Sequence, residues 1–229
     1  MTREPDAPAR RRADAYFTAS FAVARRLAEG RGEEAVAILR KELERTRERG
    51  DDITGRRFLL SQIALCHARM NEPEKAAEVL GEIERDFPPE PETALMLAEG
   101  YLLLAGNAGR ASHHAALALQ WCQERDEGSP VFYSRAHALL ARAMLADGDR
   151  LGAFGAWQSC ELPDWRVAMD LLEAGHDPAQ VRGVLAESLE RHERHEREAG
   201  AEAVATSDRI RRLIAWIDAG RPAGEPRSV

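Results

Sequence analysis

The chain has 229 residues, of which 44% are hydrophobic and 31% are charged, and its formal net charge is −7. This balance is typical of a folded protein and excludes an intrinsically disordered one. The acidic net charge and the intermixing of arginine with glutamate argue against a nucleic-acid-binding protein, which usually carries a basic domain or stripe. Ala, Leu, Glu and Arg dominate while β-branched residues are sparse, so the composition predicts an all-α fold.

Apolar periodicity and helix-breaking residues predict a series of helices, most of them in pairs. In chain order they are expected at residues 13–29, 33–48, 55–70, 74–86, 92–105, 110–123, 131–146, 150–159, 163–174, 177–198 and 207–220. Residues 1–12 and 221–229 are expected to be disordered tails around a single helical domain at residues 13–220.

Short turns separate the helices of the clearest pairs. Gly148 and Asp149 supply a left-handed residue and a helix cap, and Asn71-Glu72-Pro73 ends one helix and starts the next. The segment 106–109 is likewise expected to end one helix and start the next, with one additional residue in the turn. Ser129 is expected to cap the helix that follows it.

A pattern of large and small residues recurs around these turns. Its three clearest copies place small residues before and after the turn, 12 residues apart in the first and third copies and 13 apart in the second. These small residues are Ala64 with Ala76, Ala98 with Ala111, and Ala141 with Ala153. Small side chains at these positions allow two antiparallel helices to approach closely, and larger apolar residues fill the gaps between neighbours.

This pattern resembles the tetratricopeptide repeat (TPR), a helix–turn–helix unit. The resemblance implies a right-handed α-solenoid of about four to five repeats with a capping C-terminal helix. The spacing between successive second-helix alanines is 41, 35 and 42 residues, counted from Ala35, and not a uniform 34. Longer helices, as in the repeats of kinesin light chains and of some bacterial sensor domains, account for the departure.

The resemblance also implies a concave face lined by the first helix of each repeat. Side chains next to the packing pattern are expected to point into that groove. They are Phe58, Gln62, Leu65, Arg69, Leu95, Met96, Glu99, Arg135, Leu139 and Arg142. Apolar residues at these positions suit an amphipathic helix or apolar peptide as partner. The alternative is that the apolar members are buried by the chain's own first or last helix.

No pattern indicates catalysis, a cofactor or a metal. Cys66, Cys122 and Cys160 are expected to be buried free thiols, because each lies in an apolar helical context. His192 and His195 share a helix face, but their charged surroundings favour a solvated helix over a metal site. The chain is therefore not expected to be an enzyme.

The last predicted helix carries an apolar stripe at positions 210, 213, 214 and 217. A cap that covers the open end of the stack explains this stripe, and a homodimer contact is the alternative. No apolar run is long enough to cross a membrane and the N-terminus lacks a signal-peptide core, so a cytoplasmic location is expected. The richness in alanine and arginine suggests a bacterial source of high GC content.

The sequence thus favours a non-catalytic scaffold or adaptor that binds a protein or peptide in its groove, without nucleic acid or membrane insertion. A chaperone for a secreted or assembly-prone client is one alternative. A sensory or regulatory module that acts on another chain is the second.

Overall fold

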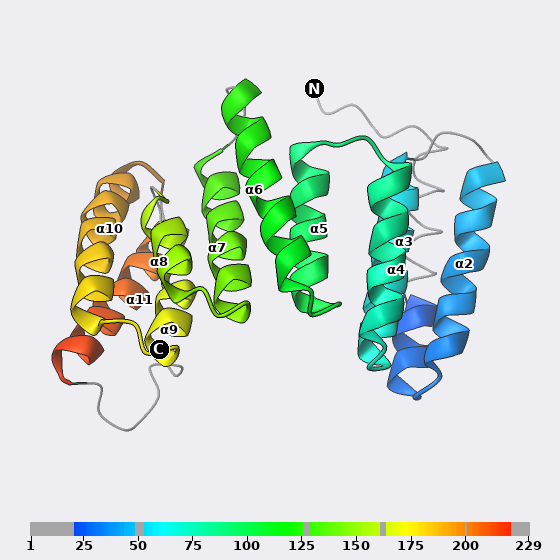
Figure 1. Ribbon diagram of the computed structural model, residues 1–229, viewed down its shortest axis with the longest axis horizontal. Helices are drawn as coiled ribbons and strands as arrows, with labels where there is room; N and C mark the ends of the chain where they lie inside the picture. The colour runs from blue at the N-terminus through cyan, green and yellow to red at the C-terminus, as the bar shows by residue number, and fades with distance from the viewer. Residues whose placement is uncertain (1–20, 49–52, 126–128, 161–163, 200, 221–229) are drawn as a thin grey trace. The chain divides into compact units, whose positions relative to one another are not determined.

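Every regular element in the described part of the chain is an α-helix. The computed structural model describes residues 21–48, 53–125, 129–160, 164–199 and 201–220, without the side chains of residues 192 and 194–206. A helical segment at residues 21–28 is followed by α2 (Gly32–Glu48), α3 (Ile53–Arg69), α4 (Pro73–Asp86), α5 (Pro91–Leu103), α6 (Ala108–Arg125), α7 (Pro130–Ala146), α8 (Arg150–Gln158), α9 (Trp165–Glu173), α10 (Pro178–Ala199) and α11 (Ala201–Asp218) (Figure 1). The all-α class predicted from composition is confirmed.

Most helix boundaries lie within two residues of those expected from the sequence, and α11 is the exception. It begins at Ala201, whereas the sequence suggested a start at Ser207. Ser207 is fully buried inside the helix and its Oγ has no hydrogen-bond partner among the described residues, so it is not an N-cap. The tails expected at residues 1–12 and 221–229 lie outside the described residues.

The chain divides into two compact units, and the division passes through α5. Unit 1 comprises residues 1–89 and 99–107, and unit 2 comprises residues 90–98 and 108–229. In unit 1, α3 packs against both α2 and α4. In unit 2, α7 packs against α6 and α8, while α10 packs against α11 and α9 contacts α7, α8, α10 and α11.

Four helix ends in the two units share one backbone arrangement. The residue just beyond each helix has a positive φ, at Gly30 (72°), Asn71 (61°), Gly148 (85°) and Gly175 (81°). Each donates its N–H to the carbonyl three residues back, and the next residue donates to the carbonyl five residues back, as Asp149 does to Met144 at 2.9 Å. This is the Schellman motif, which satisfies carbonyls at the helix end and reverses the chain. The turn chemistry predicted at Asn71 and Gly148 is confirmed.

Small buried residues stand at fixed distances from these ends. Seven residues before the left-handed position lie Val23, Ala64, Ala141 and Ala168, all of them buried. Five residues after the left-handed position lie Ala35, Ala76 and Ala153, each fully buried. α3 packs against α4 and α7 packs against α8, and each of these four helices carries one of these fully buried alanines, Ala64, Ala76, Ala141 or Ala153.

The end of α5 accommodates the additional residue that the sequence placed there. Ala105 donates its N–H to the carbonyl of Gly100, five residues back, at 3.2 Å, and Asn107 donates to Tyr101, six residues back, at 2.8 Å. The last turn is therefore wider than an α-helical one. The chain then reverses at Gly106, whose φ is 62°.

The apolar stripe of α11 belongs to the core of unit 2. Ile210, Leu213 and Ile217 are 0%, 2% and 9% exposed, and Ile214 packs against the same cluster. The cluster also holds residues of α7, α8, α9 and α10. The stripe is thus largely covered by the chain itself.

Candidate functional site

One face of α3 carries four of the residues expected to line a partner-binding groove. Phe58, Gln62, Leu65 and Arg69 are spaced four, three and four residues apart, so they follow one side of the helix. Phe58 is 39% exposed, Gln62 and Leu65 are half-buried, and Arg69 is exposed. We call these four residues the α3 face.

The C-terminal half of the α3 face, Leu65 and Arg69, borders a cavity of about 730 Å³ in unit 1. Leu65, Arg69 and Met70 form one wall, and the other wall comes from the helical segment at residues 21–28 and the turn after it. That second wall consists of Ala24, Leu27, Ala28, Gly30 and Gly32. The lining side chains are apolar except for that of Arg69, which makes no ion pair or hydrogen bond in the described structure.

The turn beside this cavity is held by a chain of polar contacts. The His67 ring nitrogen Nδ1 lies 2.8 Å from Glu72 Oε2, and Lys75 Nζ donates to Glu72 Oε1 at 2.8 Å. Lys75 and His67 together lower the pKa of the Glu72 carboxyl group, because both hydrogen bonds favour its charged form. These contacts fix the turn between α3 and α4.

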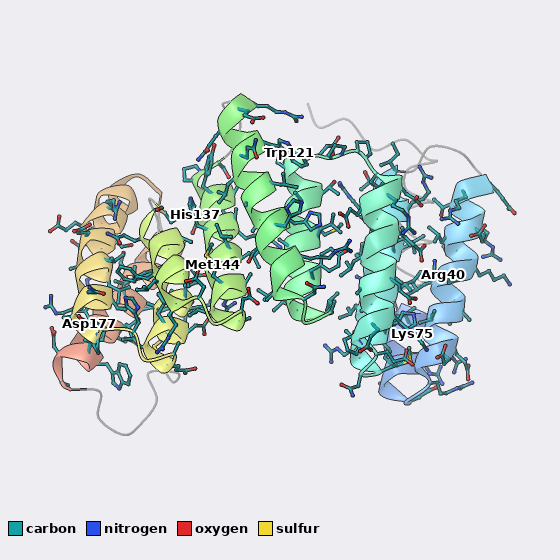
Figure 2. All side chains as sticks on the ribbon, in the orientation of Figure 1. Arg40, Lys75, Trp121, His137, Met144 and Asp177 are labelled. Carbon is teal, nitrogen blue, oxygen red and sulfur yellow. The ribbon has the colours of Figure 1, made fainter. Side chains whose placement is uncertain are left out.

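Ion pairs fix neighbouring helices relative to each other in both units. In unit 1, Arg40 of α2 lies between α2 and α4 (Figure 2) and donates two hydrogen bonds to the Glu82 carboxylate, at 2.8 and 2.9 Å. This guanidinium lowers the pKa of Glu82. In unit 2, Arg142 of α7 donates to Asp170 of α9 at 2.7 Å. Arg142, predicted to face a partner, therefore serves at least to link α7 to α9.

The other residues predicted for the groove differ widely in exposure. Leu95 and Leu139 are 5% and 7% exposed, which is the arrangement expected if the chain covers its own apolar side chains. Met96 and Glu99 are half-buried, and Arg135 is exposed. Leu95 and Leu139 therefore offer almost no surface to a partner.

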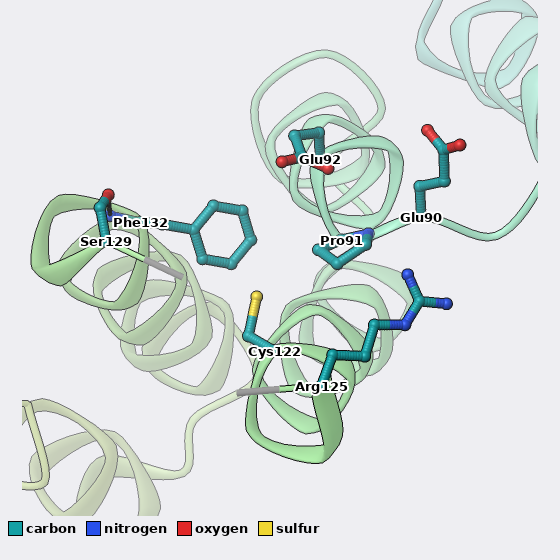
Figure 3. Close-up of a pocket in the computed structure, with 7 residues that line it drawn as sticks. All are labelled: Glu90, Pro91, Glu92, Cys122, Arg125, Ser129 and Phe132. Carbon is teal, nitrogen blue, oxygen red and sulfur yellow. Dashed lines mark hydrogen bonds between the residues drawn. The ribbon is translucent and has the colours of Figure 1, made fainter. Parts of the chain in front are cut away.

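A second cavity, of about 420 Å³, lies in unit 2 and contains none of the predicted groove residues (Figure 3). Its walls come from the start of α5, the end of α6 and the start of α7. They consist of Glu90, Pro91, Glu92, Cys122, Arg125, Ser129 and Phe132. Ser129 Oγ accepts the Phe132 N–H at 3.2 Å, as the sequence predicted for this cap. No sequence signal marks this cavity, because its walls meet only through tertiary packing.

The three cysteines are buried free thiols, as predicted. Burial raises the pKa of Cys66 to about 11, so this thiol stays protonated near neutral pH. Among the residues that the structure describes, no group of three or more His, Cys, Asp or Glu side chains is arranged to hold a metal ion. The side chains of His192 and His195 lie outside that part.

Comparison with known proteins does not assign the chain to a family. No family model matches the chain, and no curated protein matches its sequence. Within the described residues, no helix is both long and apolar enough to span a membrane.

Proposed function

We propose that this chain is a non-catalytic protein–protein interaction module built from stacked TPR-like helix pairs. The recurrence of the same helix end and the same buried small residues in both units supports the repeat. A stack of this kind offers its partner an extended surface and no reaction centre.

The α3 face and the cavity beside it are the proposed partner site. The observation that carries the proposal is a cavity bordered by the apolar side chains of Leu65 and Met70, with the guanidinium of Arg69, which has no partner among the described residues, beside them. Such a surface suits an apolar side chain of a peptide or helix, followed by an acidic or carbonyl group that accepts from Arg69. Phe58 extends the apolar contact along α3.

Peptide selection tests this site even while the natural partner is unidentified. Peptides from a random displayed library are selected on the wild-type protein, synthesised, and measured for binding to Leu65→Glu and Arg69→Glu. We expect a shared apolar-acidic pattern and at least about a tenfold loss of affinity in both variants, since each removes a central contact. Leu151→Ala, which alters a side chain that is 80% exposed on α8, is the matched control.

Two results would contradict the proposal. One is selection of peptides that bind Leu65→Glu and Arg69→Glu as tightly as wild type. The other is a failure to select any peptide that competes for a common site. Thermal melting of each variant separates loss of binding from loss of folding, because both substituted side chains have solvent-exposed surface.

A further inference from the structure

A tryptophan and several arginines form a surface on α9 and α11 of unit 2 that the proposed partner site does not use. The guanidinium carbons of Arg166 and Arg209 lie 5.7 and 5.6 Å from the centroid of the Trp165 ring. Arg212 lies one turn beyond Arg209 on α11. We call Trp165, Arg166, Arg209 and Arg212 the Trp–Arg patch.

The aromatic ring holds two of these arginines in place. Trp165 is half-buried and packs against the core of unit 2, so its ring has a fixed position. A guanidinium near an aromatic face gains cation–π energy while its N–H groups remain available to an anion. Arg166 and Arg209 are therefore oriented before any ligand arrives, which reduces the entropy lost on binding.

The positive charge of the patch is only partly neutralised by the residues that the structure describes. Arg209 and Arg212 make no ion pair with any described residue. Among the described residues, Arg166 has only Asp164, at 4.0 Å, while the nearby Asp208 is paired with Arg211 at 2.7 Å. Two other arginines on these helices are paired, Arg182 with Asp218 and Arg211 with Asp208 and Glu193. The patch thus retains donors that a bound carboxylate would satisfy.

We infer that the Trp–Arg patch binds a short acidic segment of a protein partner. Planar guanidinium groups match carboxylates through two parallel hydrogen bonds. A nucleic acid would need a longer basic stripe than the three arginines of the patch supply. A few glutamates or aspartates on a partner require only the local charge of the patch. This inference is independent of the α3 face.

The test uses the full-length protein and a fluorescein-labelled hexaglutamate peptide, followed by fluorescence anisotropy. We expect saturable binding that weakens as salt is raised, and at least about a tenfold loss of affinity in Arg209→Gln/Arg212→Gln. Arg85→Gln on α4 removes one positive charge from an exposed position in unit 1 and is the control for a general change in charge. Arg209→Lys keeps the charge but loses the planar guanidinium, so its affinity for hexaglutamate should fall between those of the wild type and the double variant.

Three outcomes would overturn the inference. The first is equal affinity for hexaglutamate in the wild type and the double variant. The second is equally tight binding of a hexaglutamine peptide, which would show that charge is not recognised. The third is tighter binding of a six-nucleotide oligothymidylate that is lost in the same variants, since this would assign the patch to nucleic acid. Variants of Leu65 and Arg69 should leave hexaglutamate binding unchanged, so this test and that of the α3 face fail separately.

Discussion

The pair α3–α4 in unit 1 and the pair α7–α8 in unit 2 both reverse the chain between two packed helices, but they do so with different side chains. Both reverse the chain through a Schellman motif, and both bury an alanine on each side of the turn. The left-handed residue is Asn71 in one pair and Gly148 in the other. The two pairs therefore share the backbone arrangement, and both asparagine and glycine satisfy it.

The two pairs also differ at positions that hold large side chains. Four residues after the second alanine stands Leu80 in α4 and Trp157 in α8, each 1% exposed. Near the start of the pattern stands Leu60 in α3 and His137 in α7. These exchanges allow the contribution of each position to be measured in a similar surrounding.

The largest effect is expected from Trp157→Ala. This change removes a fully buried ring and the hydrogen bond from its Nε1 to the carbonyl of Asp164 at 2.8 Å, which joins α8 to the start of α9. We expect a loss of about 3–5 kcal/mol in the free energy of unfolding, against about 2–5 kcal/mol for Leu80→Ala. Urea denaturation followed by circular dichroism measures both. A loss below that of an exposed alanine substitution would contradict the assigned packing.

Replacing the left-handed glycine should cost less. Gly148→Ala meets no atom within 4 Å of the new Cβ, so the cost comes from its φ of 85° alone. An L residue in this region is less stable by about 1–2 kcal/mol. Gly148→Asn introduces the residue type that stands at the equivalent position after α3, Asn71, and should lower the free energy of unfolding by less than Gly148→Ala does. Equal stability of all three proteins would show that this helix end frays in solution.

Loss of the N-cap of α8 should have a smaller effect. Asp149 Oδ1 accepts the Gly152 N–H at 2.8 Å, whereas Glu72 makes no side-chain cap to α4, which begins with a proline. Asp149→Ala should cost about 1 kcal/mol of unfolding free energy. Asp149→Asn, which keeps an acceptor, serves as the control. The measurement is the urea midpoint at neutral pH.

The smallest effect is a dependence of stability on pH that comes from His137, a position at which the first pair has Leu60. Burial lowers the pKa of His137 below its ordinary 6.5, although a hydrogen bond to the backbone of Ala156 opposes the shift. The unfolded chain therefore takes up a proton at a higher pH than the folded chain does, and stability is lost as the pH falls through 6.5.

His137→Leu installs the residue type found at Leu60 and should remove that part of the acid sensitivity. The difference between the urea midpoints at neutral and mildly acidic pH, compared in wild type and variant, measures it. An unchanged difference would assign the acid sensitivity to other groups. Asn71→Gly in the first pair, which introduces no titrating group, is the control.

The helix ends and the small residues near them could be predicted from the sequence because they depend on local chemistry. Gly148 and Asn71 tolerate a positive φ, Asp149 and Ser129 have short acceptors for capping, and Pro73 cannot continue a preceding helix. Each of these signals acts within a few residues and does not depend on distant contacts.

Features that depend on tertiary packing could not be predicted in the same way. The start of α11 was misplaced because Ser207-Asp208 resembles a cap, whereas Ser207 is buried within the helix. Leu95 and Leu139 were expected beside a groove, and their burial follows from neighbours that the residue pattern does not specify. The Trp–Arg patch joins residues more than 40 positions apart in the chain.

The three buried cysteines make it possible to measure how often different segments of the molecule open. Cys66 lies in α3, Cys122 in α6 and Cys160 just after α8, so each reports on a different segment. An alkylating reagent reaches such a thiol only during transient opening, and the rate of modification then gives the frequency of that opening. Mass spectrometry of timed samples would rank the segments by how often they open.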